Sequence, residues 1–158
     1  MKTKIEKALK ESAIKTFEDI CFMYLEPELE DEQKNLALEA AAQVKFKGDY
    51  NGRLVVETRG GLFAAIAANM LGNDLPSFQQ KNDALGEVAN IICGNVVPSL
   101  GRKSGQEYKI ESPAILSVDE IPAETEKPLA QVTLNLSEGR ADIKFFLDDK
   151  NSFKEKKD

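Results

Sequence analysis

Three segments carry apolar residues at the three- and four-residue spacing that is typical of amphipathic helices. The predicted helices cover Lys4 to about Leu25, Gly61 to Leu71, and Asn82 or Asp83 to about Leu100. Pro27 is expected to end the first helix, and glycines follow the other two. Pro98 predicts a kink or an early exit in the last turn of the third helix.

Alternation of apolar and polar residues predicts strands that form two hairpins. These strands are Gln43–Gly48, Arg53–Thr58, Leu129–Leu136 and Ala141–Leu147. A further strand, Tyr108–Leu116, contains Pro113 and is therefore expected to lie at a sheet edge or to bend. Leu36–Ala42 favours a helix by composition, although the first strand of the first hairpin can also be a long one.

Hairpins interspersed with helices predict an α+β domain, in which helices pack on a mostly antiparallel sheet. The length of 158 residues suits one domain over residues 1–158, with an ordered core at about 4–149 and a charged tail at 150–158. The charge-dense stretch Glu26–Asn35 and the acidic stretch Val118–Pro128 are expected to be loops.

Composition and charge exclude several classes of function. The net charge of −6 disfavours nucleic acid and anionic membranes as partners. No apolar run suits a membrane span or a secretory signal, so we expect a cytoplasmic protein. The chain has no histidine, which removes the usual general base and leaves Cys21 and Cys93 without the partners of a standard zinc site. Both cysteines are expected to be reduced core residues, and no metal or cofactor of the protein's own is expected.

The third predicted helix carries the candidate chemistry. At about 100° per residue, Asp83, Glu87, Asn90 and Gly94 fall within a stripe roughly 60° wide, opposite an apolar face. Gly94 lowers helix propensity but leaves room for the backbone of another molecule. The stripe therefore indicates a docking groove. Glu-x-x-Asn alone is usually only a solvent-exposed pattern, and the chain contains a second copy, Glu32-x-x-Asn35, in its acidic loop.

The surroundings of the first copy distinguish it from the second. Asp83-x3-Glu87-x2-Asn90 is followed after 22 residues by Pro113, and this resembles the signature of the CheX/CheC/FliY phosphatases of bacterial chemotaxis. The second copy lacks both the leading Asp or Ser and the distant proline. The resemblance is closest to CheX and extends from about Ile5 to Leu147. Its further parts are the glycine-marked hairpin Val44–Gly48 and Gly52–Val56, the helix Ala64–Gly72, and the strand Ile110–Ile115.

The resemblance implies a CheX-like fold, a homodimer, and hydrolysis of the phospho-aspartate of a CheY-type receiver domain, with Mg²⁺ supplied by that response regulator. Asn90 would orient the attacking water, and Glu87 would pair with the receiver's lysine. Asp83 would cap the helix or add a contact, and Pro113 would shape the neighbouring strand. Two alternatives remain open. One is a non-catalytic adaptor that binds a receiver or a flagellar-switch partner. The other, weaker one is a metal-dependent carboxylate hydrolase, which would need clustered acids, whereas Glu107, Glu111 and Asp119 show no such helical or strand geometry.

Overall fold

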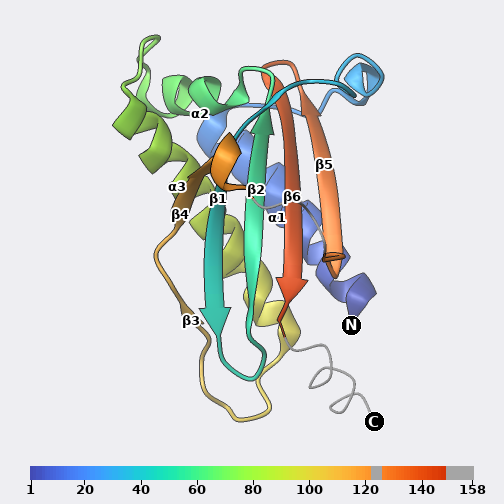
Figure 1. Ribbon diagram of the computed structural model, residues 1–158. Helices are drawn as coiled ribbons and strands as arrows, with labels where there is room; N and C mark the ends of the chain where they lie inside the picture. The colour runs from blue at the N-terminus through green and yellow to red at the C-terminus, as the bar shows by residue number, and fades with distance from the viewer. Residues whose placement is uncertain (122–125, 149–158) are drawn as a thin grey trace.

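The computed structural model describes residues 1–121 and 126–148, and the predicted charged tail at 150–158 lies outside these residues. Three α-helices, six strands and three short 3₁₀ helices occur in the described part of the chain (Figure 1). The helices are α1 (Lys2–Cys21), α2 (Leu62–Leu71) and α3 (Phe78–Val96), and the 3₁₀ helices are η1 (Pro27–Leu29), η2 (Val97–Leu100) and η3 (Val118–Glu120). The strands are β1 (Leu38–Lys47), β2 (Gly52–Arg59), β3 (Lys109–Ile110), β4 (Ala114–Ser117), β5 (Ala130–Leu136) and β6 (Gly139–Leu147).

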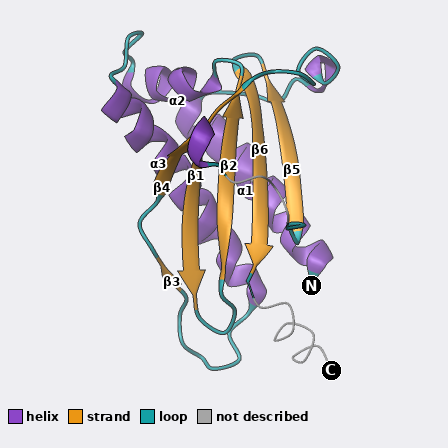
Figure 2. Cartoon of the chain, viewed as in Figure 1, coloured by secondary structure: helices purple, strands orange, loops and turns teal. Residues whose placement is uncertain are grey.

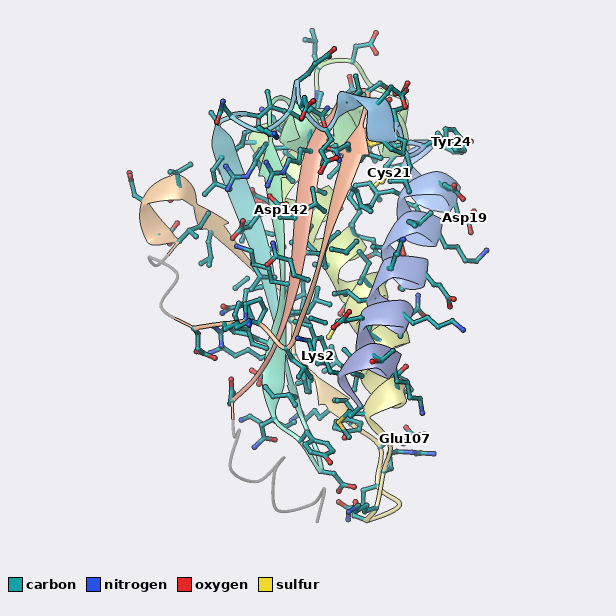
Figure 3. All side chains as sticks on the ribbon, turned by 90° about the vertical axis from the view of Figure 1, so that its right-hand side faces the viewer. Lys2, Asp19, Cys21, Tyr24, Glu107 and Asp142 are labelled. Carbon is teal, nitrogen blue, oxygen red and sulfur yellow. The ribbon has the colours of Figure 1, made fainter. Side chains whose placement is uncertain are left out.

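The strands form one antiparallel sheet in the order β3-β1-β2-β6-β5, and β4 also pairs with β1. Helices α1 and α3 lie side by side across one face of this sheet, and α2 packs at one end (Figure 2). The view turned by 90° separates the helix layer from the sheet (Figure 3). The predicted α+β class, with helices packed on a mostly antiparallel sheet, is confirmed.

The core lies between the two layers and follows the period of each element. Alternate residues of the central strands point toward the helices and are buried, as with Val44, Leu54 and Ile143. Helix α1 contributes its buried stripe from Ile5 to Cys21, and α3 contributes Leu85 through Val96. Both cysteines are buried and free, as predicted.

The first predicted helix ends earlier than expected, at Cys21. Phe22 adopts the left-handed conformation, with φ 57°, and the Asn69 side-chain amide donates a hydrogen bond to the Cys21 carbonyl at 2.8 Å. This contact from α2 satisfies a carbonyl at the helix end, so the helix stops before Pro27 is reached.

The helix that the composition of Leu36–Ala42 favours does not form, because β1 already begins at Leu38. Ala40 and Ala42 face the helix layer and are buried, and α3 packs against this strand. Small side chains let the helix approach the sheet closely, and this packing overrides the intrinsic helix preference of alanine. The alternative of a long first strand is confirmed.

The strand predicted around Pro113 is interrupted at the proline and lies at a sheet edge, as expected. Strands β3 and β4 both pair with β1 at the edge of the sheet, and Pro113 lies between them. The closing hairpin of β5 and β6 is also confirmed, with Ala130–Leu136 paired to Gly139–Leu147.

Candidate functional site

Helix α3 begins at Phe78, about one turn before the predicted start. Ser77 is its N-cap and accepts a hydrogen bond from the backbone N–H of Gln80, while the Gln80 side chain accepts one from the backbone N–H of Ser77. This reciprocal capping box corrects the prediction that Asn82 or Asp83 caps the helix. Asp83 therefore lies inside the helix, on its exposed side. At the other end, the helix passes into η2 just before Pro98, as the proline predicts.

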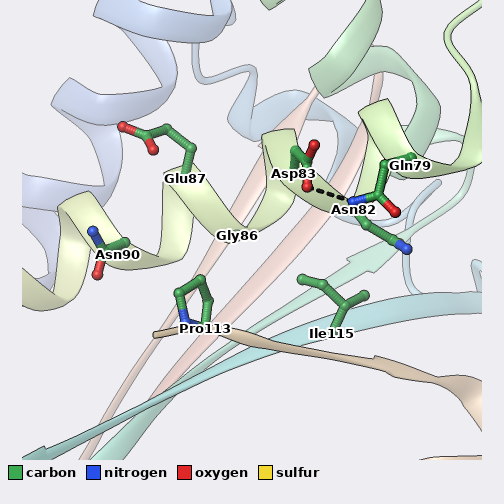
Figure 4. A pocket seen from close by; sticks show the side chains of 8 residues that line it. All are labelled: Gln79, Asn82, Asp83, Gly86, Glu87, Asn90, Pro113 and Ile115. Carbon is green, nitrogen blue, oxygen red and sulfur yellow. Dashed lines mark hydrogen bonds between the residues drawn. The ribbon is translucent and has the colours of Figure 1, made fainter. Parts of the chain in front are cut away.

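The four residues of the predicted stripe are all exposed on α3, whereas Leu85, Val88 and Ala89 on the opposite side are buried. Asp83, Glu87 and Asn90 line one side of a groove, and Pro113 and Ile115 line the other (Figure 4). Gly94 lies farther along the helix, outside this lining, and a Cβ placed there would meet no atom within 4 Å. The structure thus brings four of the five predicted site residues together and leaves Gly94 beside them.

The groove has a volume of about 470 Å³ and is open to solvent (Figure 4). Its lining comprises Gln79, Asn82, Asp83, Gly86, Glu87, Asn90, Pro113 and Ile115. These residues include two carboxylic acids and no lysine or arginine. The groove therefore attracts a cationic group and repels a free anion.

Glu87 and Asn90 are available to a partner. Within residues 1–121 and 126–148, neither side chain has a hydrogen-bond or ion-pair partner. They lie three residues apart on one helix, so their Cβ atoms are separated by about 5–6 Å. A carboxylate and a neutral carboxamide are thus presented together, the first able to bind a cation and the second able both to donate and to accept hydrogen bonds.

Asp83 is held differently. The Gln79 amide donates a hydrogen bond to Asp83 Oδ1 at 2.7 Å, which fixes the carboxylate along the helix surface (Figure 4). The neighbouring Asn82 Oδ1 is a buried acceptor that no described residue satisfies. Sequence reasoning missed Gln79 because it placed the helix start too late, although the Ser77-x-x-Gln80 pattern predicts the earlier start. It considered Asn82 only as a helix cap and not as part of a groove.

Gly86 fixes how closely the two sides of the groove approach. A Cβ at this position would lie 3.1 Å from Pro113 Cγ and 3.8 Å from Ile115 Cδ1. The absence of a side chain therefore lets the segment around Pro113 approach the helix between Asp83 and Glu87. Gly86 and Ile115 also escaped sequence reasoning, because their role depends on a contact between segments far apart in the chain.

The second Glu-x-x-Asn copy forms no comparable arrangement. Glu32 and Asn35 are exposed in the turn that follows η1, and neither lines the groove. The described residues also contain no cluster of three or more acidic or cysteine side chains placed to hold a metal ion. No helix in the described ranges is both long and apolar enough to span a bilayer.

Comparison with known proteins gives a consistent picture. The sequence profile of a family described as "Chemotaxis phosphatase CheX" matches residues 40–137. No curated protein sequence matches the chain significantly.

The fold is also similar to several solved structures. A chemotaxis protein CheX from Desulfovibrio desulfuricans is 21% identical, with a TM-score of 0.68 over 91% of this chain and 99% of that one. CheX from Borrelia burgdorferi, solved in a complex with CheY, BeF3 and Mg²⁺, is 15% identical, with a TM-score of 0.65 over 90% and 97% of the two chains. FliY from Thermotoga maritima is 17% identical, with a TM-score of 0.60 over 95% and 90%.

Proposed function

Because this chain belongs to the chemotaxis phosphatase CheX family, we propose that it hydrolyses the phospho-aspartate of a CheY-type receiver domain. Asn90 orients the attacking water, and Glu87 docks the receiver's lysine. The observation that carries this proposal is the pair itself, exposed on one helix face at the groove and without partners in the described chain. We expect the protein to act in the cytoplasm as a homodimer.

The charge of the groove favours a phosphoryl group that arrives on a protein. A free phosphate would meet Asp83 and Glu87 with no compensating cation in the groove lining. A phosphorylated receiver brings Mg²⁺ and a lysine to its own phosphoryl group, so the two partners complement each other. Glu87 can then bind the lysine, which fixes the register of the two proteins.

The chemistry left to this chain is positioning. The Asn90 carboxamide is neutral, so it can approach the phosphoryl group without electrostatic repulsion, and its oxygen can accept a hydrogen bond from water. A water held in line with the bond from phosphorus to the aspartate oxygen attacks phosphorus. That bond breaks, inorganic phosphate leaves, and the receiver's aspartate carboxylate is restored.

The test is the decay of phosphorylated receiver with and without the protein. We expect Asn90→Ala to lower the catalysed rate by about 10²-fold or more, because positioning of the water is most of the catalysis. Asn35→Ala is the matched control, since Asn35 belongs to the other Glu-x-x-Asn copy and is also exposed. The assignment of the site is wrong if the Asn90 variant dephosphorylates the receiver as fast as the wild-type protein.

The alternative is an adaptor that binds a receiver or a flagellar-switch partner without hydrolysis. The availability of Asn90 favours the enzyme, because docking through Glu87 alone does not need a neutral hydrogen-bonding group beside it. An adaptor would bind the activated receiver and leave its phosphoryl lifetime unchanged.

A further inference from the structure

Asp83 carries a charge that the stability of the fold does not explain. Ser77 already caps α3, and Asp83 lies beyond the first turn of the helix, where a carboxylate gains little from the helix dipole. Glu87 follows four residues later on the same exposed side, and two like charges at this spacing destabilise a helix. A role in binding therefore explains the charge of Asp83 better than a role in folding.

Gln79 holds the Asp83 carboxylate at one end of the groove. The Gln79 side-chain amide donates a hydrogen bond to Asp83 Oδ1 at 2.7 Å, and both residues line the groove. The other carboxylate oxygen, Oδ2, has no partner among residues 1–121 and 126–148. A carboxylate that is held through one oxygen loses less conformational freedom when it binds a partner through the other.

Asp83 lies too far along the helix to contact a phosphoryl group held at Asn90. The two residues are seven positions apart, which corresponds to about 10 Å along the helix axis. Figure 4 shows Gln79 and Asp83 toward one end of the groove and Asn90 at the other, with Glu87 between them. A receiver whose phosphoryl group lies at Asn90 therefore meets Asp83 with a part of its surface outside the phosphorylation site.

The surroundings of Asp83 suit a long cationic side chain. The groove lining includes no lysine or arginine, so the described residues leave the charge of this carboxylate uncompensated. Asn82 Oδ1, at the same end of the groove, is a second acceptor to which no described residue donates. The facing wall is apolar and consists of Pro113 and Ile115 (Figure 4).

Both features fit an arginine better than a lysine. The aliphatic part of either side chain can pack along the apolar wall while its charged end reaches Asp83. A guanidinium carries five N–H donors in a planar array and pairs well with a carboxylate, whereas an ammonium group has three donors around a single nitrogen.

We propose that Asp83 is the specificity-determining residue of the groove and binds a cationic side chain, an arginine in preference to a lysine, about 10 Å from the phosphoryl group on the receiver surface. This inference rests on the proposed function. Gln79 is a positioning residue that acts through Asp83. The lysine that Glu87 binds belongs to the site that receivers share, so Glu87 alone does not distinguish them. A receiver with an acidic side chain opposite Asp83 is rejected by charge repulsion.

The experiment measures the affinity of this chain for CheY-type receivers encoded in the same genome, each activated with beryllofluoride and Mg²⁺. Asp83→Asn removes the charge and keeps the shape of the side chain. Asp19→Asn on α1 is the matched control, because Asp19 is also an exposed carboxylate held by a residue four positions earlier, Lys15, at 2.9 Å. Thermal unfolding verifies that each variant is folded, and Asp83→Asn should lose no stability because repulsion from Glu87 is relieved.

We expect Asp83→Asn to raise Kd for the cognate receiver about tenfold and to make binding less dependent on salt. KM in the phosphoryl-decay assay should rise with a much smaller change in kcat, and Asp19→Asn should change neither constant. Gln79→Ala should raise Kd by a smaller factor. In the Asp83→Asn background, Gln79→Ala should have no further effect, since Gln79 acts only through the carboxylate.

A double-mutant cycle identifies the group that Asp83 binds. Each arginine and lysine around the phosphorylation site of the cognate receiver is replaced by alanine in turn, and each replacement is combined with Asp83→Asn and, separately, with Glu87→Gln. We expect one cationic residue to be coupled to Asp83, and a different one, the active-site lysine, to be coupled to Glu87. Coupled binding without hydrolysis by the wild-type protein would support the role of Asp83 and refute the phosphatase.

Three results would overturn the inference. In the first, Asp83→Asn binds as tightly as the wild-type protein while Glu87→Gln weakens binding; the proposed function then survives and the role of Asp83 does not. In the second, Asp83 and Glu87 are coupled to the same lysine, so no second cationic group is recognised. In the third, no activated receiver binds the wild-type chain, which refutes the proposed function as well.

Discussion

Glu87 and Asn90 lie side by side but differ in charge, and this difference separates their proposed roles. A carboxylate near a phosphoryl group would repel it, whereas a carboxylate that meets a lysine at the rim of the groove gains a charge-assisted contact. Asn90 is neutral and suits the position nearest the reacting phosphorus. The two residues should therefore affect different kinetic constants.

We expect Glu87→Gln to raise KM for the phosphorylated receiver about tenfold and to change kcat at saturation much less. The substitution keeps the shape of the side chain but removes the charge that pairs with the receiver's lysine. The affinity of the variant should also depend less on salt than that of the wild-type protein. Glu11→Gln, at an exposed acidic position on α1, is the control. A fall in kcat with an unchanged KM would instead place Glu87 in the chemical step.

Gly86 and Gly94 form an internal comparison, because both lie in α3 but only Gly86 faces another segment. Alanine favours a helix over glycine by about 1 kcal/mol. Gly94→Ala should therefore stabilise the protein by about that amount, since its Cβ meets nothing within 4 Å. Gly86→Ala should stabilise the protein less than Gly94→Ala. The new Cβ would lie 3.1 Å from Pro113 Cγ, so the segment around Pro113 must move by a few tenths of an ångström.

The same movement should change activity. With Pro113 displaced, the groove beside Glu87 alters its shape, and we expect kcat/KM of Gly86→Ala to fall several-fold. Urea unfolding and the phosphoryl-decay assay measure the two effects separately. Equal stabilisation by both substitutions, with full activity for Gly86→Ala, would mean that the close approach has no functional role.

At the scale of elements, the capping of α3 determines which residues belong to the site. The capping box at Ser77 extends the helix by about one turn beyond the predicted start and so places Gln79 beside Asp83. Ser77→Ala should lower the free energy of unfolding by about 1 kcal/mol, because it leaves the Gln80 N–H without its side-chain acceptor. Urea titration compares this variant with Ser112→Ala, at an exposed position outside any helix. Equal stability of the two variants would contradict the capping role.

The elements with strong periodicity could be predicted from the sequence, and those set by tertiary contacts could not. The closing hairpin alternates clearly, and its register follows from this pattern and its short turn. The helix prediction for Leu36–Ala42 was wrong because its alanines favour a helix in isolation, whereas in the fold they lie in β1 and pack against α3. The predicted end of α1 was also wrong because of a tertiary contact: the Asn69 amide, which donates a hydrogen bond to the Cys21 carbonyl, comes from another helix.

The candidate site shows the same division. The stripe of Asp83, Glu87 and Asn90 follows from helical periodicity alone, because one element carries all three. Pro113 was predicted only through the family resemblance, and its position opposite Gly86 required the fold. Asn82 and Ile115 could not be predicted, since their place in the groove depends on how the strand segment crosses the helix.

For the whole molecule, the two faces of the sheet are stabilised in different ways. The face toward the helices is apolar, whereas the other face carries a charged network centred on Asp142 (Figure 3). Asp142 accepts hydrogen bonds from Arg59 at 3.1 Å, Arg140 at 3.1 Å and Thr133 at 2.7 Å. Buried charges are tolerated when they are paired in this way. The network thus pairs the buried Asp142 carboxylate on the polar outer face of the sheet.

The buried cysteines couple the stability of the whole domain to alkaline pH. Burial raises the pKa of the Cys21 thiol to about 12, with a smaller contribution from Glu138, and burial alone raises the pKa of Cys93 to about 12. In the unfolded chain both thiols have a pKa near 9.0. Between these values the unfolded state loses protons that the folded state keeps, so stability falls as the pH rises.

The stabilising effect of the protonated thiols is therefore complete below pH 9 and disappears toward pH 12. At pH 10 each cysteine should lower the free energy of unfolding by about 1.4 kcal/mol relative to neutral pH. Urea unfolding at pH 7 and pH 10 measures the difference, and the double variant Cys21→Ala, Cys93→Ala should lose most of it, even though its stability at neutral pH is lower. An equal pH dependence in both proteins would show that other groups cause the alkaline loss. Both thiols are buried in the core between the sheet and the helix layer, so a difference of this size would show that water is excluded from both sites.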